Sequence, residues 1–151
     1  GFISANTVGG MDKSEQFFNN FLTDPTKGKL RNVFNHECGG ITELAADYLG
    51  IHDYVTTIST ACSSSANAIL FGARLIKQRM LDVVVAGGTD ALTKFTLNGF
   101  NALMILDKEF CKPFDENREG LNLGEGAGYV VLVSEKVAAS LRTERNYRLT
   151  G

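Results

Sequence analysis

Hydrophobic positions along the chain form two kinds of segment that alternate. Short apolar runs, most of them rich in β-branched residues, predict strands at residues 1–8, 54–60, 82–87, 128–133 and 146–151. Apolar residues three and four positions apart predict helices at residues 11–22, 39–50, 63–80, 95–105 and 134–142. This alternation indicates an α/β fold, in which residues 54–87 form a right-handed βαβ unit with parallel strands.

Capping and turn residues predict where several of these segments begin and end. Two glycines follow the first strand, and Asp12 with Glu15 is placed as a capping pair for the helix after them. Residues 23–36 are polar and contain a proline and a glycine, so we expect a loop there. Gly50 is expected to stop the second helix.

Composition favours a single soluble domain. The chain has 151 residues, of which 44% are hydrophobic and 21% charged, enough apolar material for a core. The net charge of −2 comes without a long basic run, which argues against nucleic acid or an anionic membrane surface as a partner. No apolar stretch is long enough to predict a membrane span.

The cysteines indicate reduced thiols. Cys38, Cys62 and Cys111 are an odd number, and no two of them form a Cys-x-x-Cys pair. Only His36 and His52 are available to join them as metal ligands. We therefore expect a reducing, cytoplasmic location and no metal site or disulfide framework.

Cys62 stands at a junction that suits a nucleophile. It follows the strand at 54–60 and precedes a helix whose apolar residues are spread over nearly all faces, so we expect that helix to be buried. At a helix N-terminus, free N–H groups and the macrodipole favour a thiolate and can hold an oxyanion. Free cysteine is also often a small buried apolar residue, and position alone leaves both interpretations open.

A catalytic base for this cysteine is hard to find in the sequence. His52 precedes the strand that ends near Cys62, which puts it roughly 25 Å away at about 3.3 Å per residue. It is therefore expected in a loop at the far end of the sheet. His36 lies in the loop at 23–36 and is a weak candidate. The chain is thus expected to hold only half of a site.

Two long motifs resemble a known family. They are STACSSSANAILFGARLIKQRMLDVVVAGGTDA and CKPFDENREGLNLGEGAGYVVLVSEKVAA. Both are similar to the type II elongating β-ketoacyl-acyl-carrier-protein synthases, the synthase II-like members of the thiolase superfamily. The resemblance implies a thiolase-like fold, five-layered αβαβα in the full enzyme. In it, Cys62 would accept the acyl group as a thioester.

The same resemblance implies that residues 1–151 are a partial N-terminal half, the middle third of a synthase. The family's first strands and its C-terminal half, with two catalytic histidines, a lysine and a glycine-rich loop, have no counterpart here. We therefore expect this piece alone to be inactive. Its strand edges and an apolar helix should be uncovered.

The implied activity is a decarboxylating Claisen condensation of the acyl-enzyme with malonyl-acyl carrier protein, in fatty acid or related polyketide or polyene biosynthesis. It requires acyl carrier protein as partner and neither metal nor organic cofactor, and the enzyme is expected to be a homodimer. Three alternatives remain. They are a non-catalytic subunit of the chain-length-factor kind, a degradative thiolase, and a fragment that binds without catalysing.

Other polar and glycine-rich positions have structural interpretations. The Gly-x-Gly-x-Gly pattern at 124–128 leads into a strand, which argues against a dinucleotide site and favours close backbone packing. Cys38 and Cys111 are expected to be packing residues. Structural hydrogen bonds and turn capping are favoured over catalysis for the remaining acidic and basic candidates, Glu125, Asp115, Arg118 and Glu119.

Residues 35–40, with the sequence NHECGG, depart from the long-chain members of the family. Those relatives carry apolar residues there, near the dimer interface and the partner's acyl pocket. If His36 or Glu37 faces that pocket, a shorter, more polar or conjugated acyl group is the expected substrate.

Overall fold

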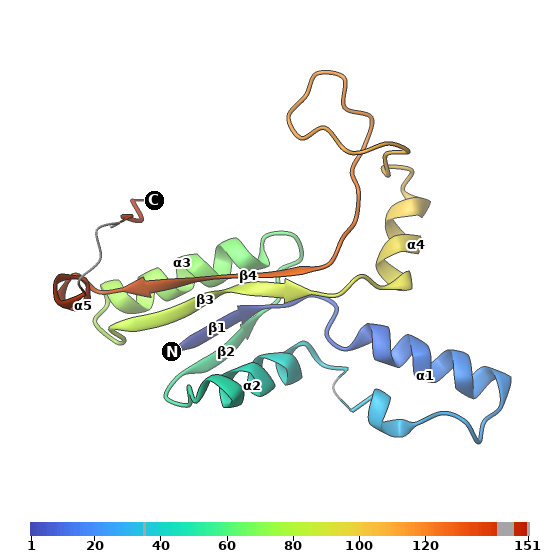
Figure 1. Ribbon diagram of the computed structural model, residues 1–151, viewed down its shortest axis with the longest axis horizontal. Helices are drawn as coiled ribbons and strands as arrows, with labels where there is room; N and C mark the ends of the chain where they lie inside the picture. Colours follow the sequence, from blue (N-terminus) through green and yellow to red (C-terminus); the bar gives the residue numbers. More distant parts are fainter. Residues whose placement is uncertain (35, 142–146, 151) are drawn as a thin grey trace.

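A computed structural model describes residues 1–34, 36–141 and 147–150, and it has a four-stranded mixed sheet at its centre. The strand order is β2-β1-β3-β4 (Figure 1). β1 runs parallel to both of its neighbours, whereas β4 is antiparallel to β3. The strands are β1 (Phe2–Ala5), β2 (Val55–Ile58), β3 (Val83–Asp90) and β4 (Gly126–Val133).

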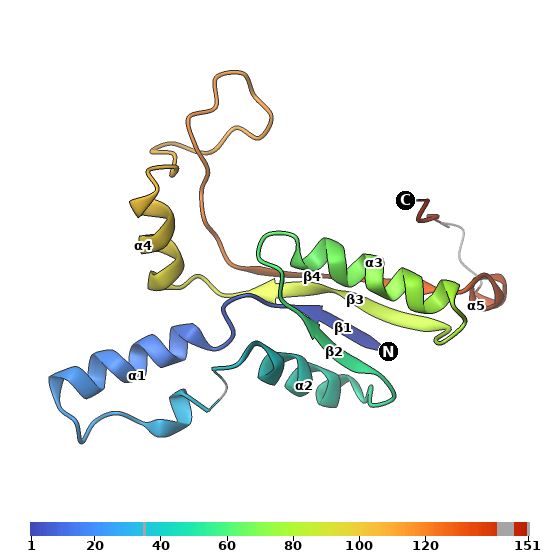
Figure 2. The ribbon, with the colours of Figure 1, turned by 180° about the vertical axis from the view of Figure 1, so that it is seen from behind.

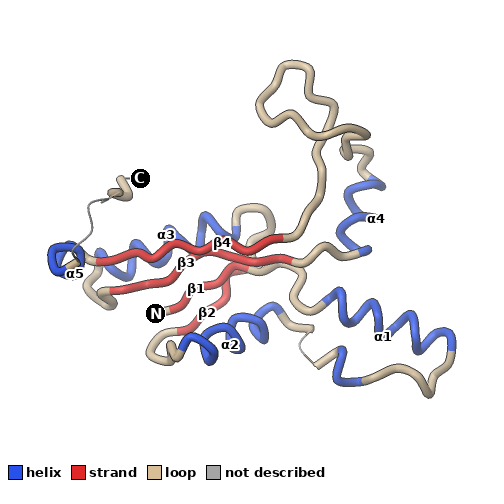
Figure 3. Tube along the Cα trace, in the orientation of Figure 1, coloured by secondary structure: helices blue, strands red, loops and turns tan. Residues whose placement is uncertain are grey.

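Helices alternate with these strands, as the hydrophobic pattern predicts. Those that precede β3 are α1 (Met11–Thr23), the 3₁₀ turn η1 (Leu30–Asn32), α2 (Cys38–Leu49) and α3 (Ser64–Lys77). The remaining helices are α4 (Lys94–Ala102) and α5 (Glu135–Ser140) (Figure 3). The strand expected at 146–151 is wrong over 147–150, which are irregular, and its two end residues lie outside the described part.

The core lies between the sheet and α3. Ile3 of β1 and Val84 of β3 are completely buried against Ala68 and Leu75 of α3. Gly72 of α3 permits the close approach, since a Cβ there would lie 3.0 Å from a methyl carbon of Val84. α3 therefore owes its position to apolar packing.

α2 lies on the opposite face of the sheet from α3 (Figures 1 and 2). The Thr57 hydroxyl of β2 donates to the Thr42 hydroxyl of α2 at 2.8 Å. α2 ends at Gly50 with a φ of 67°, the left-handed conformation that its predicted role as a stop requires.

α3 is not buried on nearly all sides, contrary to the prediction. Ala68 and Leu75 face the sheet, but Leu70 is 38% exposed on the other side. In the described part of the chain, nothing packs on that outer face as the sheet does on the inner one. The expected uncovered apolar helix is therefore present, and β4 likewise leaves Val131 64% exposed at the edge of the sheet.

The predicted capping pair of α1 is wrong. α1 begins at Met11 after Gly10, with no side-chain cap, so Asp12 lies inside the first turn instead of capping it. Glu15 reaches a different helix: its carboxylate accepts from the N–H groups of Lys94 and Phe95. The error arises because the contact between Glu15 and α4 joins residues far apart in the sequence, which a local capping pattern does not reveal.

Among the helices that the structure describes, none has the length and apolar character needed to cross a membrane.

Candidate functional site

A cavity with a volume of about 740 Å³ lies at the carboxyl ends of β1 and β3. Its walls are the ends of β1 and β3, the turn before α3, one side of α4 and the segment before β4. Cys62 lines this cavity and is exposed. The strand-to-helix junction that the sequence analysis selected is therefore part of a concave, largely apolar site.

The backbone makes a tight turn at Cys62. Ala61 adopts a φ of 53°, a left-handed conformation that is uncommon outside glycine. Ser63 is the N-cap of α3, so Cys62 immediately precedes the helix, as predicted. The turn projects the cysteine toward the cavity instead of into the core of the sheet.

Ser64 stabilises this turn through two hydrogen bonds. Its hydroxyl accepts from the Thr60 N–H at 2.8 Å and donates to the Ala61 carbonyl at 2.6 Å. Ser64 is only 4% exposed, so water is a poor substitute for these two bonds. The Asn67 amide also donates to the Thr60 hydroxyl at 2.8 Å. Small polar side chains thus stabilise the unusual backbone on both sides of Cys62.

Asp90, which lines the cavity, joins the end of β3 to the turn after β1. Its carboxylate accepts from the N–H groups of Thr7 at 2.9 Å and Val8 at 3.2 Å, and from the Thr7 hydroxyl. The Asn6 side chain donates to the Thr89 carbonyl at 2.6 Å, which ties β1 to β3 a second time. The sequence analysis missed both residues. The available signal was a polar residue at the end of a buried strand or directly after it.

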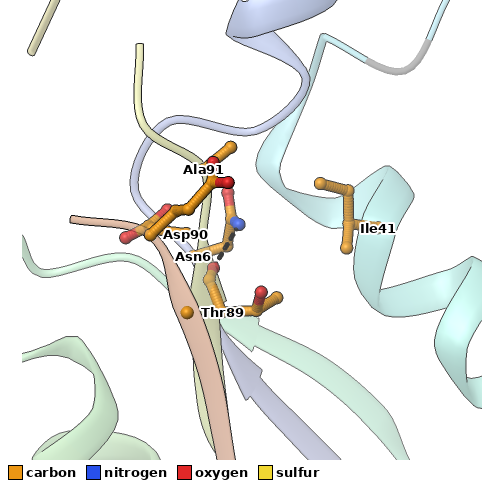
Figure 4. Close-up of a pocket in the computed structure, with 7 residues that line it drawn as sticks. Asn6, Ile41, Thr89, Asp90 and Ala91 are labelled. Atoms are coloured by element: carbon orange, nitrogen blue, oxygen red, sulfur yellow. Dashed lines mark hydrogen bonds between the residues drawn. The ribbon is translucent and has the colours of Figure 1, made fainter.

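A second cavity, of about 330 Å³, adjoins the same strand ends (Figure 4). Asn6, Thr89, Asp90 and Ala91 line it, together with Ile41 from α2. The dashed line in Figure 4 is the bond from Asn6 to the Thr89 carbonyl. Because Thr89, Asp90 and Ala91 also line the larger cavity, the tied strand ends border both.

Two carboxylates hold the start of α4 beside the cavity. Glu15 of α1 accepts from Lys94 N–H at 3.0 Å and Phe95 N–H at 2.7 Å. Glu125, before β4, accepts from Leu92 N–H at 3.1 Å. The structural role predicted for Glu125 agrees with this contact.

Neither histidine is placed beside Cys62. His36 Nδ1 lies 2.8 Å from the Ser14 hydroxyl, and His52 Nδ1 lies 3.5 Å from an Asp47 carboxylate oxygen. Neither histidine lines either of the two cavities described above. In the described part of the chain, the residues that line the two cavities thus include Cys62 and no histidine.

Glu37 is exposed and is the N-cap residue of α2, but its side chain makes no capping bond, and it does not line either cavity. The hypothesis that His36 or Glu37 faces a partner's acyl pocket concerns a second subunit, so it stays a prediction.

The remaining cysteines and the polar loop have structural contacts. Cys38 and Cys111 are partly buried, and neither lines the two cavities. The Asp115 carboxylate accepts from Asn117 N–H at 2.7 Å, and Arg118 donates to the Asp115 carbonyl at 2.8 Å. These are turn contacts of the kind expected.

Among the described residues, no group of three or more His, Cys, Asp or Glu side chains is placed to bind a metal ion.

The glycine pattern at 124–128 leads into β4, but the expected close packing is wrong for it. A Cβ at Gly124, Gly126 or Gly128 would meet no atom within 4 Å. In this pair of strands the crowding is instead on β3: a Cβ at Gly87 would lie 2.1 Å from the Gly128 carbonyl oxygen. The difference arises because β4 is an outer strand with an open face, whereas β3 has a neighbour on each side.

The comparisons with known proteins agree with this architecture. The family described as "Beta-ketoacyl synthase, N-terminal domain" matches residues 8–138. Nodulation protein E of Rhizobium leguminosarum bv. trifolii is 35% identical over 136 residues, which cover 87% of this chain and 33% of that protein.

Solved structures show the same fold. The ketosynthase ApeO, in complex with its chain length factor ApeC from Xenorhabdus doucetiae, matches with a TM-score of 0.78 and 32% identity over 89% of this chain and 34% of that one. The ishigamide ketosynthase/chain length factor matches with a TM-score of 0.86 and 25% identity over 92% of this chain and 35% of that one. This confirms the thiolase-like α/β fold.

The chain thus spans about a third of the length of these relatives. The match over residues 8–138 includes β2, β3 and β4, the Cys62 turn and most of the residues that line the larger cavity. The chain belongs to the β-ketoacyl synthase family.

Proposed function

We propose that the protein containing this chain is a condensing acyltransferase in which Cys62 carries the acyl group. One observation supports this most strongly: an exposed cysteine stands at a strained turn before α3, on the wall of a cavity of about 740 Å³. An acyl chain bound to Cys62 has room in that cavity. A cysteine that served only packing would not need the left-handed Ala61 or the two bonds of Ser64.

In the first step, the Cys62 thiolate attacks the carbonyl carbon of an acyl group carried as a thioester on acyl carrier protein. The new carbon–sulfur bond gives a tetrahedral oxyanion, which N–H groups at the start of α3 are suited to stabilise. The bond to the carrier sulfur then breaks, and the carrier leaves as its thiol after taking up a proton. The acyl group remains on Cys62.

In the second step, malonyl-acyl carrier protein loses carbon dioxide, and the electron pair of the broken bond forms an enolate. The enolate carbon attacks the acyl carbonyl on Cys62, and the Cys62 thiolate leaves. The product is a β-ketoacyl carrier two carbons longer. In the family, the groups that stabilise the enolate are two histidines of the C-terminal half, so the described chain alone is expected to be inactive.

The proposal includes acyl carrier protein as partner and no resident metal or organic cofactor, because the phosphopantetheine arm arrives on the carrier. A second synthase subunit is expected in a homodimer. Pairing with a chain length factor is the alternative, as in the ApeO complex.

The cytoplasm is the proposed location, in keeping with three free cysteines. That residues 1–151 are a partial N-terminal half also stays a prediction.

Intact mass of the full-length protein after incubation with acyl-acyl carrier protein, without malonyl donor, tests the first step. We expect an increase of one acyl group in the wild type and in Cys111→Ser, and none in Cys62→Ala. An acyl group on another residue contradicts the proposal. No acylation with any chain length favours the non-catalytic subunit, and extension with acetyl-coenzyme A in place of malonyl carrier favours a thiolase.

A further inference from the structure

α4 forms a wall of the larger cavity, yet little packing holds it there. Phe95, Thr96, Gly99 and Phe100 line the cavity. Within the described part of the chain, however, α4 has no buried residue, and Phe95 is 66% exposed. A short helix that buries so little is marginal by itself, so its position depends on the contacts at its ends.

The strongest of these contacts comes from Glu15. Its two carboxylate oxygens accept separately from Phe95 N–H at 2.7 Å and Lys94 N–H at 3.0 Å. Both N–H groups belong to the first turn of α4, where a helix has no internal acceptor for them. The bonds are charge-assisted. The negative carboxylate also interacts favourably with the positive end of the helix dipole. α1 and α4 lie at the same end of the sheet, beyond the carboxyl ends of β1 and β3 (Figure 1).

Two further contacts complete the anchor. Glu125 accepts from Leu92 N–H at 3.1 Å, just before the helix. Thr93, which is 1% exposed, caps α4 by accepting from Thr96 N–H at 3.1 Å. Of these, Glu15 is the contact that fixes the helix to a separate element, because Thr93 is its own N-cap and Glu125 binds the segment leading into it.

We propose that Glu15 is a positioning residue that sets the acyl-chain selectivity of the cavity by anchoring α4. This rests on the proposed function. Glu15 contacts α4 and not the acyl group, so it acts through the position of the cavity wall. A long acyl chain that extends from Cys62 along α4 depends on that wall. A short chain that ends near Cys62 does not.

The test compares Glu15→Ala, Glu15→Gln and the wild type in the full-length protein. Asp12→Asn is the matched control, because it neutralises a carboxylate on the same helix, one that forms an ion pair with the exposed Lys13 at 3.5 Å. The readouts are kcat/KM for acylation of Cys62 from carriers with a short and a long saturated chain, and alkylation of Cys62 by iodoacetamide, which needs no acyl cavity.

With Glu15→Ala, we expect the ratio of kcat/KM for the long chain to that for the short chain to fall on the order of tenfold, since two charge-assisted bonds are lost. The fall should appear in KM more than in kcat. Glu15→Gln should give a smaller change, because its amide oxygen can still accept one of the two bonds. Iodoacetamide alkylation and the Asp12→Asn variant should match the wild type.

An unchanged ratio in Glu15→Ala overturns the proposal. So does an equal loss for both chains together with slower alkylation, because that result indicates a general structural role. Hydrogen exchange of the 92–96 amides provides a readout that needs no activity. Faster exchange in Glu15→Ala than in Asp12→Asn supports the anchor, and equal exchange overturns it.

Failure of the proposed function has a different signature. If the wild type accepts neither acyl chain, the selectivity part of the proposal is overturned together with that function. The exchange measurement then decides by itself whether Glu15 anchors α4.

Discussion

The helices α3 and α4 border the same cavity but are held in different ways. α3 packs on the sheet through buried residues such as Ala68 and Leu75. α4 buries none of its own residues in the described chain, and the Glu15 carboxylate of α1 holds its first turn. Apolar packing therefore fixes α3, whose start carries the Cys62 turn, while polar contacts fix the start of α4. The proposed nucleophile therefore stands at the start of a helix with a buried face, whereas the proposed chain-binding wall is a helix without buried residues in the described chain.

A matched pair of leucine truncations tests this contrast with the largest expected effect. Leu75 of α3 is 6% exposed and Leu97 of α4 is 38% exposed. Leu75→Ala should lower the free energy of unfolding by roughly 2–5 kcal/mol, as for other buried leucines. Leu97→Ala should lower it by less than about 1 kcal/mol. Denaturant unfolding of the full-length variants measures both, and equal losses would contradict the comparison.

A pair of glycine substitutions tests the sheet beneath α3. At Gly87 of β3 a Cβ would collide with the Gly128 carbonyl, whereas at Gly128 of β4 it would enter open space. We expect Gly87→Ala to cost about 1–3 kcal/mol through strain in the β3–β4 pairing. Gly128→Ala should leave the Tm close to that of the wild type. Similar Tm values for the two variants would show that the strands can separate without cost.

Removal of the Ser64 hydroxyl tests the support of the cysteine turn. Ser64→Ala deprives Thr60 N–H of its acceptor and the Ala61 carbonyl of a donor. The expected loss is about 1–2 kcal/mol of stability, because both groups are partly buried. Iodoacetamide should also alkylate Cys62 at a changed rate. Ser63→Ala is the control, since its hydroxyl is exposed, and an effect as large as that of Ser64→Ala would count against a specific role.

The smallest expected effect concerns the loop after α1. Hydrogen bonds from the Thr26 hydroxyl and N–H hold the pKa of Asp24 below its ordinary value. The folded-state pKa lies below the unfolded one, so this contribution to stability is present above the unfolded pKa. It is lost as the pH falls through the folded value. Thr26→Ala should move the pKa of Asp24 upward in an NMR titration, and no movement would contradict the assignment.

The sequence predicted the fold well where the signal is local. The alternation of strands and helices, the stop at Gly50 and the position of Cys62 immediately before α3 all follow from residues close together in the chain. Prediction failed where a residue has a distant partner. Glu15 has a normal spacing for a cap on α1, yet its acceptor oxygens bind residues 79 and 80 positions later.

The sequence by itself therefore determined the order of elements, the family and the candidate nucleophile. These depend on periodicity, on backbone preferences of single residues and on long motifs. Only the tertiary structure decided that Asp90 ties β3 to the turn after β1, that Gly87 is crowded by β4, and that Glu15 contacts the start of α4. Each of these is a contact between segments far apart in sequence, so its energy depends on the folded arrangement and leaves no periodic pattern to detect.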